Sequence, residues 1–135
     1  MFTSLILAST ILVQAGSLHL LGETADGTKY QVVTSTTEVV ASTDSVTFVM
    51  RTDRAKPIKI GNDIIVSVIE ETVVICKAEK VITTSQVGMN SLGETVIIST
   101  SPVIYNVPLK NTMLIAQMHK YGCDLLKKKG LKSTI

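Results

Sequence analysis

Val, Ile and Thr dominate residues 30–98, and this enrichment constrains the fold more than any other feature of the chain. Their β-branched side chains are stiff and fit a pleated sheet better than a helix. Between residues 45 and 51, the apolar Val46, Phe48 and Met50 alternate with Ser45, Thr47 and Val49. Because side chains alternate between the two faces of a strand, this pattern predicts a sheet with one buried face.

Turn-forming residues divide this region into predicted strands. Asp26-Gly27 is a tight-turn signal that would join strands at about residues 17–21 and 29–33. Pro57 cannot donate to a strand ladder, so we expect residues 53–57 to break the next strand. Gly61-Asn62-Asp63 predicts a further turn.

The Ser- and Thr-rich residues 34–47 suggest loop and edge-strand structure, with a glycan-bearing or adhesive loop as the alternative. Further strand-like runs are residues 64–69, 72–83 and 94–99, the last two forming a hairpin around the loop at residues 88–93.

After Pro108 the spacing of apolar residues changes from strand-like to helical, and Asn111-Thr112 can cap the start of a helix there. We predict one helix at about residues 111–129, ending at Gly130. The whole pattern predicts an α+β fold, a single antiparallel sheet of about five to six strands with this helix packed on it. The apolar face of the predicted helix repeats at helical spacing and consists of Leu114, Met118, Tyr121 and Leu125.

The first 15 residues carry no charged side chain and contain an apolar run. Val13 and Ala15 place small side chains three and one residues before a cut after Ala15, which is the pattern of a signal peptidase site. We therefore predict a signal peptide at residues 1–15 and a single domain at residues 16–135. The alternative is a buried first strand or helix of an intracellular domain. No apolar run in the chain reaches the roughly 20 residues that a membrane-spanning helix needs.

Cys76 and Cys123 are the two cysteines of the chain. In an oxidising compartment they can pair, and they allow only one intramolecular disulfide. Cys76 lies in the alternating run with Val74 and Ala78, and Cys123 lies beside the apolar face of the predicted helix. A disulfide would therefore tie the helix to the sheet. The alternative is two buried free thiols, which are common in protein cores.

The composition describes one globular domain of 135 residues. A hydrophobic fraction of 45% with 18% charged residues excludes a disordered chain. A net charge of +2 is too small to indicate a nucleic-acid partner. Trp is absent and aromatic residues make up 4%, which argues against a large stacking surface for sugars or bases.

The sequence contains none of the common catalytic motifs, such as GxSxG, HExxH or a glycine-rich phosphate loop. His19 and His119 are far apart, and the two histidines and two cysteines show no ligand motif such as CxxC or HExxH, so no metal or cofactor is predicted. Glu70 and Glu71 would face opposite sides of a strand and do not form an acid–base pair. We therefore predict a non-catalytic protein whose isolated polar residues lie on a solvated surface.

Lys127, Lys128 and Lys129 are the binding candidates of the sequence. They fall in the last turn of the predicted helix, where cations suit the negative helix end. Such a cluster would suit an acidic partner or lipid head groups. The alternative is an ordinary basic helix end in solvent.

The order of the elements resembles the surface-adhesin protein E-like domains of bacterial secreted and envelope proteins. A leader and strand pairs precede residues 70–76, which end in Cys76. After them come another strand, a glycine-containing turn before Val96-Ile97 and a Pro-led helix that contains Cys123. The match spans residues 18–123. The family usually opens with a Trp-containing strand, where this chain has Leu18-His19-Leu20. It also has basic residues after the strand cysteine, matched here only by Lys77 and Lys80.

The resemblance implies a disulfide between a late strand and the C-terminal helix, and an exported, adhesin-like module that binds a protein. We expect a secreted, periplasmic or cell-envelope protein whose exposed sheet edge pairs with a protein partner or a second copy. One alternative is a structural component of an envelope or particle assembly, intracellular or particle-bound if residues 1–15 are retained. Another is an inhibitor of a secreted hydrolase that acts through residues 88–93.

Overall fold

The computed structural model describes residues 17–107 and 113–133, without the side chains of residues 113 and 130–133. The predicted signal peptide and the predicted helix cap at Pro108, Asn111 and Thr112 lie outside these residues. No helix of the described part is long and apolar enough to cross a membrane.

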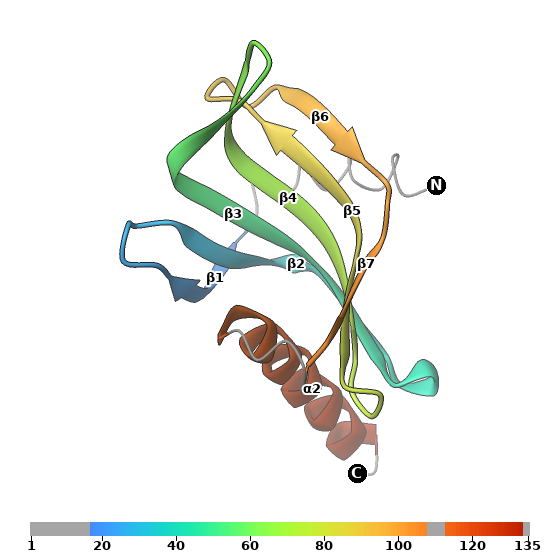
Figure 1. Ribbon diagram of the computed structural model, residues 1–135. Coiled ribbons are helices and arrows are strands. Elements are labelled where there is room, and N and C mark those ends of the chain that lie inside the picture. Colours follow the sequence, from blue (N-terminus) through green and yellow to red (C-terminus); the bar gives the residue numbers. More distant parts are fainter. Residues whose placement is uncertain (1–16, 108–112, 134–135) are drawn as a thin grey trace.

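Most of the described chain is a single antiparallel sheet, followed by one helix (Figure 1). Within the described residues the sheet has seven strands, so the predicted count of five to six was too low. The strands are β1 (Leu18–Glu23), β2 (Lys29–Val40), β3 (Ser45–Ile60), β4 (Asp63–Ile75), β5 (Lys80–Met89), β6 (Thr95–Ser99) and β7 (Val103–Asn106). A short 3₁₀ helix, η1 (Ala41–Thr43), precedes β3, and α2 (Met113–Ser133) follows β7.

The first six strands follow one another across the sheet in chain order, and β7 also pairs with β5. β6 pairs with residues 86–89 of β5, and β7 pairs with residues 80–83, so the two short strands share one edge of β5. The chain between them contains Pro102, which has no backbone N–H to donate to a ladder. This interruption produces the strand that the sequence analysis missed.

β3 continues through the region where we expected a break, so that prediction was wrong. The pairing with β4 shifts register between Asp53 and Ile58, which accommodates Pro57 without ending the strand. Asp53 is fixed at this irregularity because its carboxylate accepts hydrogen bonds from Gln31, Arg51 and Ser67, each at 2.8 Å. A network of polar side chains therefore replaces the expected loop.

The Ser- and Thr-rich segment is mostly strand, because β2 extends to Val40. Its pairing with β1 ends at Val33, so in the described chain the rest of β2 lies at the sheet edge. Thr36 supports the register shift that follows Val33. Its hydroxyl donates to the carbonyl of Val33 (2.6 Å) and accepts from the amide of Val49 (2.9 Å). The edge-strand interpretation of these residues is confirmed, and the loop is confined to residues 41–44.

The predicted strand at residues 72–83 was also wrong, since β4 ends at Ile75 and residues 76–79 form a turn. Glu79 adopts a positive φ of 52° there. The backbone carbonyl and the side chain of Asp44 support this turn from outside: Cys76 N–H donates to the Asp44 carbonyl (3.1 Å), and Lys77 N–H donates to the Asp44 carboxylate (2.6 Å). Residues 76–79 contain no glycine, so the sequence carries no turn signal between the β-branched residues on either side.

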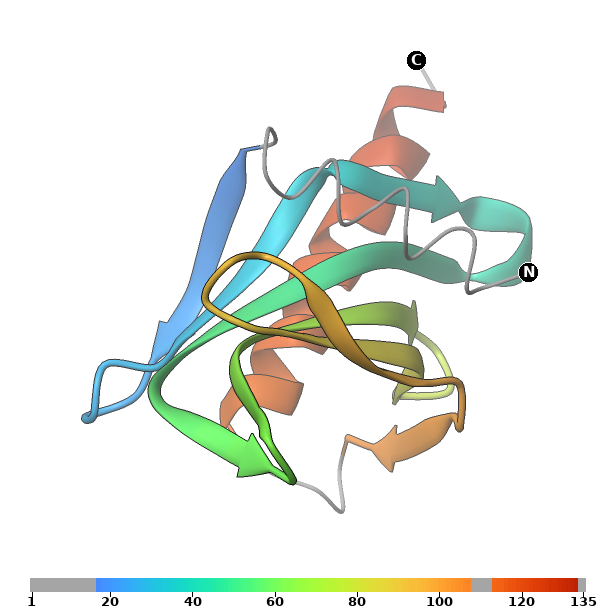
Figure 2. The same cartoon turned by 90° about the horizontal axis from the view of Figure 1, so that it is seen from above.

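α2 crosses one face of the sheet and contacts β1 to β5 (Figure 2). It continues past the predicted stop at Gly130 to Ser133, since a single glycine inside a helix costs only about 1 kcal/mol. Gly122 allows the close approach, because a Cβ there would lie 3.0 Å from the Cβ of Val74. The core beneath the helix consists of Val32, Val46, Phe48, Met50, Val74, Val81, Ile115 and Met118.

A second set of buried apolar residues forms a separate cluster. Val49 belongs to it although its neighbours Phe48 and Met50 belong to the helix-side core. Adjacent strand residues point to opposite faces, so both faces of β3 are buried rather than the one that we predicted. The cluster consists of Val33, Val49, Ile69, Val87 and Met89.

Candidate functional site

The Cys76–Cys123 disulfide joins the turn after β4 to the middle of α2, with the two Cα atoms 5.7 Å apart. The predicted pairing is therefore confirmed, although Cys76 lies in a turn and not inside a strand. His119, one helical turn before Cys123, contacts the same region: its Nε2 lies 3.3 Å from the Cys76 carbonyl oxygen. The disulfide fixes where α2 lies on the sheet and so fixes the space beside it.

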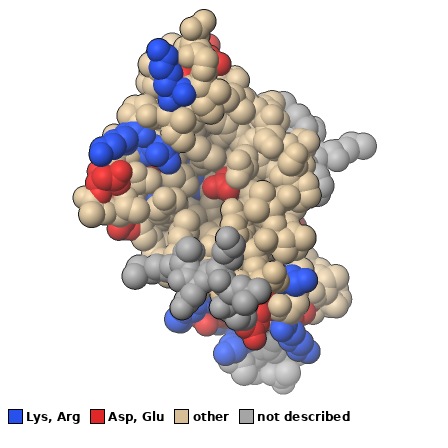
Figure 3. All heavy atoms as spheres, viewed as in Figure 1, with Lys and Arg blue, Asp and Glu red and all other residues tan. Residues whose placement is uncertain are grey.

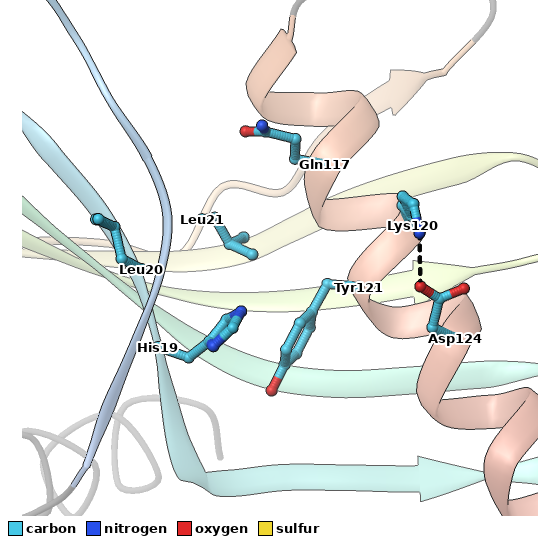
Figure 4. Close-up of a pocket in the computed structure, with 7 residues that line it drawn as sticks. All are labelled: His19, Leu20, Leu21, Gln117, Lys120, Tyr121 and Asp124. Atoms are coloured by element: carbon cyan, nitrogen blue, oxygen red, sulfur yellow. Dashed lines mark hydrogen bonds and ion pairs between the residues drawn. The ribbon is translucent and has the colours of Figure 1, made fainter.

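An open groove of about 230 Å³ lies between β1 and α2 (Figure 4). We call it the β1–α2 groove. One wall is strand and the other is helix, and the two come from opposite ends of the described chain. The residues that line it are His19, Leu20 and Leu21 from β1 and Gln117, Lys120, Tyr121 and Asp124 from α2.

Tyr121 connects the groove to the core. Its ring stacks on His19, with ring centroids 5.2 Å apart and an interplanar angle of 28°. On the core side it forms a T-shaped pair with Phe48, with ring centroids 5.4 Å apart and an interplanar angle of 84°. Offset and edge-to-face aromatic pairs of this kind contribute about 0.5–1.5 kcal/mol beyond area burial. The position of Tyr121 in the groove is therefore fixed by its packing against His19 and Phe48.

The helix side of the groove carries both charges. The Nζ of Lys120 donates to a carboxylate oxygen of Asp124 at 2.9 Å, one helical turn away. This hydrogen bond holds the pKa of Asp124 below its usual value and raises the pKa of Lys120. Both side chains are well exposed, so the pair adds little to stability but offers a donor and an acceptor to a ligand.

β1 is an edge strand of the described sheet, since it pairs there only with β2. Every second residue of such a strand directs its N–H and C=O groups away from the sheet. Leu18 and Leu20 are 40% and 50% exposed, respectively, and a register irregularity after Leu20 lets Leu21 pack against the helix-side core. An edge that is unpaired within the described residues therefore lies beside a groove, which is an arrangement that suits an extended peptide.

The opposite edge, formed by β6 and β7, is less regular. It also exposes apolar side chains, among them Ile98 and Ile104 at 47% and 57%. The ladder is interrupted between the two strands, where Pro102 lies. A partner strand could therefore form only short stretches of backbone pairing on this side.

Lys127, Lys128 and Lys129 are exposed on α2, but they precede its last turn because the helix continues to Ser133. Lys129 already has a partner, because its Nζ donates to the carbonyl of Val39 at 3.0 Å. The three lysines do not line the β1–α2 groove. Their role in binding stays a prediction.

The two histidines lie at different sites: His19 lines the groove, and His119 contacts the backbone carbonyl of Cys76 beside the disulfide. No group of three or more His, Cys, Asp or Glu side chains within the described ranges is arranged to hold a metal ion. The groove residues were not predicted, because only the fold brings β1 and α2 together. Tyr121 was assigned to the apolar helix face, which is correct but gives no hint of the groove.

Glu70 and Glu71 occupy opposite faces of β4, as predicted, since Glu70 lines a cavity on the helix side whereas Glu71 pairs with Val49 of the second cluster. Glu71 is buried and Glu70 is partly buried, so the prediction that isolated polar residues are solvated was wrong here. Burial disfavours the ionised form and raises the pKa of both carboxyl groups. For Glu70, a hydrogen bond from Gln86 offsets part of this effect.

This burial predicts a dependence of stability on pH. When the pKa is higher in the folded than in the unfolded protein, the folded state binds protons more tightly, and stability increases as the pH falls from neutral through the folded pKa. The Glu70→Gln/Glu71→Gln variant should lose this increase, and each single variant should lose part of it. Urea unfolding at neutral and mildly acidic pH measures it. An equal increase in the double variant and the wild type would show that other groups cause it.

No family model matches this sequence, and no curated protein sequence matches it. The fold is similar to that of Haemophilus influenzae protein E. One solved structure of that protein has a TM-score of 0.50 and 11% sequence identity over 66% of this chain and 74% of the other. Its crystal form II also gives 0.50 and 11%, over 65% and 76%. The predicted resemblance is thus confirmed at the level of the fold.

Proposed function

We propose that this protein is an exported, non-catalytic module that binds a protein partner, in the manner of an adhesin. The observation that carries the proposal is the β1–α2 groove beside the edge of β1 that no other described strand pairs with. Both walls of the groove are rigid, since α2 is tied to the sheet by the disulfide and Tyr121 is packed between His19 and Phe48. A rigid site loses little entropy on binding.

The occupant that fits this site is an extended segment of the partner. Such a segment can add to the edge of β1 through backbone hydrogen bonds, while alternate side chains enter the groove. Leu20 and Leu21 offer apolar contacts, and Lys120 and Asp124 offer one charge of each sign. Backbone pairing supplies affinity, and the side chains in the groove supply specificity.

Export is supported by two features of the chain. Disulfides persist in oxidising compartments such as the periplasm and the extracellular space, and this fold is tied by one. Residues 1–15 have the pattern of a signal peptide. The fold similarity to protein E agrees with the adhesin-like role that the sequence resemblance implied.

Selection of displayed random peptides against the oxidised protein tests the site directly. Addition of a selected peptide should shift the backbone amide signals of β1 and of residues 117–124 in a ¹⁵N NMR spectrum. Methylation of alternate peptide nitrogens should abolish binding, because it removes the donors that pair with β1. Leu20→Asp should weaken binding about tenfold or more through loss of an apolar contact and the burial of a charge.

The matched control is Ile104→Asp, which places the same charge on an exposed leucine-sized residue of the other edge. It should leave peptide affinity unchanged. If Ile104→Asp abolishes binding and Leu20→Asp does not, the β6–β7 edge binds the partner and the assignment to β1 is wrong. If selection yields no peptide whose binding depends on either edge, the protein does not act by strand addition.

A second candidate function has one observation in its favour. The turn between β5 and β6 carries Leu92, the most exposed large hydrophobic residue of the described chain at 81%. Asn90 braces this turn, because its side-chain oxygen accepts from the amides of Leu92 (3.0 Å) and Glu94 (2.9 Å). A rigid loop with a protruding side chain is what an inhibitor of a secreted hydrolase requires. Inhibition that Leu92→Ala removes would support it, and absence of inhibition across a panel of secreted proteases would reject it.

A further inference from the structure

A second cavity, of about 90 Å³, lies between the sheet and the start of α2. In Figure 3 this face of the molecule is hollowed, and acidic atoms are visible at the base of the hollow. Glu70 is the one acidic residue among the described residues that line the cavity. The others are Tyr30, Met50, Thr52, Thr83, Tyr105, Leu114, Ile115 and Met118.

The carboxylate of Glu70 has hydrogen-bonding capacity left over. Gln86 donates to its Oε2 at 3.0 Å, and the hydroxyl of Thr83 is its second donor. An ionised carboxylate can accept about four hydrogen bonds, so about half of its capacity is free for a ligand. Two neutral donors compensate only part of the cost of burying this charge.

No positive side chain faces Glu70 from the described lining. β2 and β7 contribute Tyr30 and Tyr105, and the residues from β3 and α2 are uncharged. A buried carboxylate without a cation is costly, and the group responds by holding its proton. Burial accordingly raises the pKa of Glu70. A cation in the cavity would remove the cost and let the proton leave.

The walls define which cation fits. Tyr30 and Tyr105 offer aromatic rings, whose faces attract cations, and Met50, Leu114 and Met118 offer apolar surface to an alkyl chain. A volume of about 90 Å³ holds about three waters, so only a small group or the end of a longer chain can enter. A hydrated metal ion gains nothing from apolar walls, whereas an alkylammonium group uses both kinds of surface.

We propose that this cavity binds the end of an alkylammonium group, which forms a charge-assisted hydrogen bond with Glu70 while its methylene groups contact the apolar wall. The group can come from a free small amine or from a lysine side chain of a protein partner. The second source rests on the proposed function, and the first does not.

Titration with n-propylammonium chloride, followed by NMR signals of Tyr30 and Tyr105, tests the proposal without any partner. The wild type should bind propylammonium more tightly than 1-propanol, its neutral counterpart of the same size. Glu70→Gln should weaken propylammonium binding about tenfold or more and leave 1-propanol unaffected. Affinity should increase with pH while Glu70 loses its proton, and this pH dependence should be absent in the variant.

Glu71→Gln is the matched control, because it removes a carboxylate from the opposite face of the same strand. It should leave propylammonium binding unchanged. Equal binding of propylammonium and 1-propanol, or full binding by Glu70→Gln, would overturn the proposal. Nα-acetyl-lysine methylamide and its norleucine analogue distinguish the sources: preference for the lysine compound over propylammonium assigns a partner's lysine, and the reverse preference assigns a free amine.

Discussion

Replacing both Cys76 and Cys123 with Ala should lower the free energy of unfolding by about 4 kcal/mol. The disulfide closes a loop with a sequence separation of 47 residues, and the chain-entropy model assigns about this value to a loop of that length. The loss would be a large share of the stability of a domain of this size, which is typically about 5–15 kcal/mol. Urea unfolding of the oxidised wild type and of the double variant measures the difference.

Reductant provides the internal control for this prediction. It should destabilise the wild type to a similar degree and leave the double variant unaffected. Because the bond also fixes α2 against the sheet, the double variant should bind a groove-selected peptide more weakly even under conditions in which it remains folded. A double variant as stable as the oxidised wild type would show that the core alone holds the helix in place.

Phe48→Ala should destabilise the protein by about 3–5 kcal/mol, the usual cost of removing a buried Phe side chain from a core. Phe48 is only 2% exposed and lies at the centre of the helix-side core. Its ring makes a T-shaped contact with the ring of Tyr121, so the cavity left behind would lie next to the floor of the β1–α2 groove. Thermal or urea unfolding measures the loss, and the NMR signals of His19 and Tyr121 should report the loosened ring stack.

Phe48→Leu is the matched control, because Leu restores most of the apolar volume without an aromatic ring. It should cost clearly less than Phe48→Ala and yet still weaken the contact with Tyr121. If Phe48→Ala shifts neither the stability nor the signals of the groove residues, the proposed connection between core and groove is wrong.

The parts of the fold that could be predicted from sequence are those with local signals. The alternation of residues on either side of Phe48 indicated a strand, and Asp26-Gly27 and Gly61-Asn62 marked turns. The 3.6-residue repeat of apolar residues around Tyr121 indicated the helix. Each of these signals depends on neighbours in the chain, so it is visible without tertiary structure. The disulfide could be predicted because two cysteines allow only one pairing.

The parts that could not be predicted depend on contacts between distant segments. The turn at residues 76–79 contains no Gly or Pro and depends on Asp44, over 30 residues earlier. Pro57 was expected to end a strand, but the side chains around Asp53 stabilise a register shift instead. The candidate sites are of the same kind, since only the fold stacks His19 on Tyr121 and brings Glu70 and Tyr105 to one cavity.

The similarity to protein E bears on the fold and does not by itself assign a function. Unrelated functions share folds, and at 11% identity the side chains of a binding site need not be retained. The functional argument therefore depends on the residues of this chain. The β1–α2 groove supports protein binding through the edge of β1, and the Glu70 cavity supports a charged group that a partner or a small amine would supply.

Intact mass spectrometry of the protein from its native host, with and without reductant, tests the central claim most directly. An exported, disulfide-tied module should have the mass of a chain that begins at Gly16 and should gain two hydrogens on reduction of the Cys76–Cys123 bond. A chain that retains residues 1–15 and carries two free thiols would contradict both export and the tied helix. That result would favour an intracellular or particle-bound structural component instead.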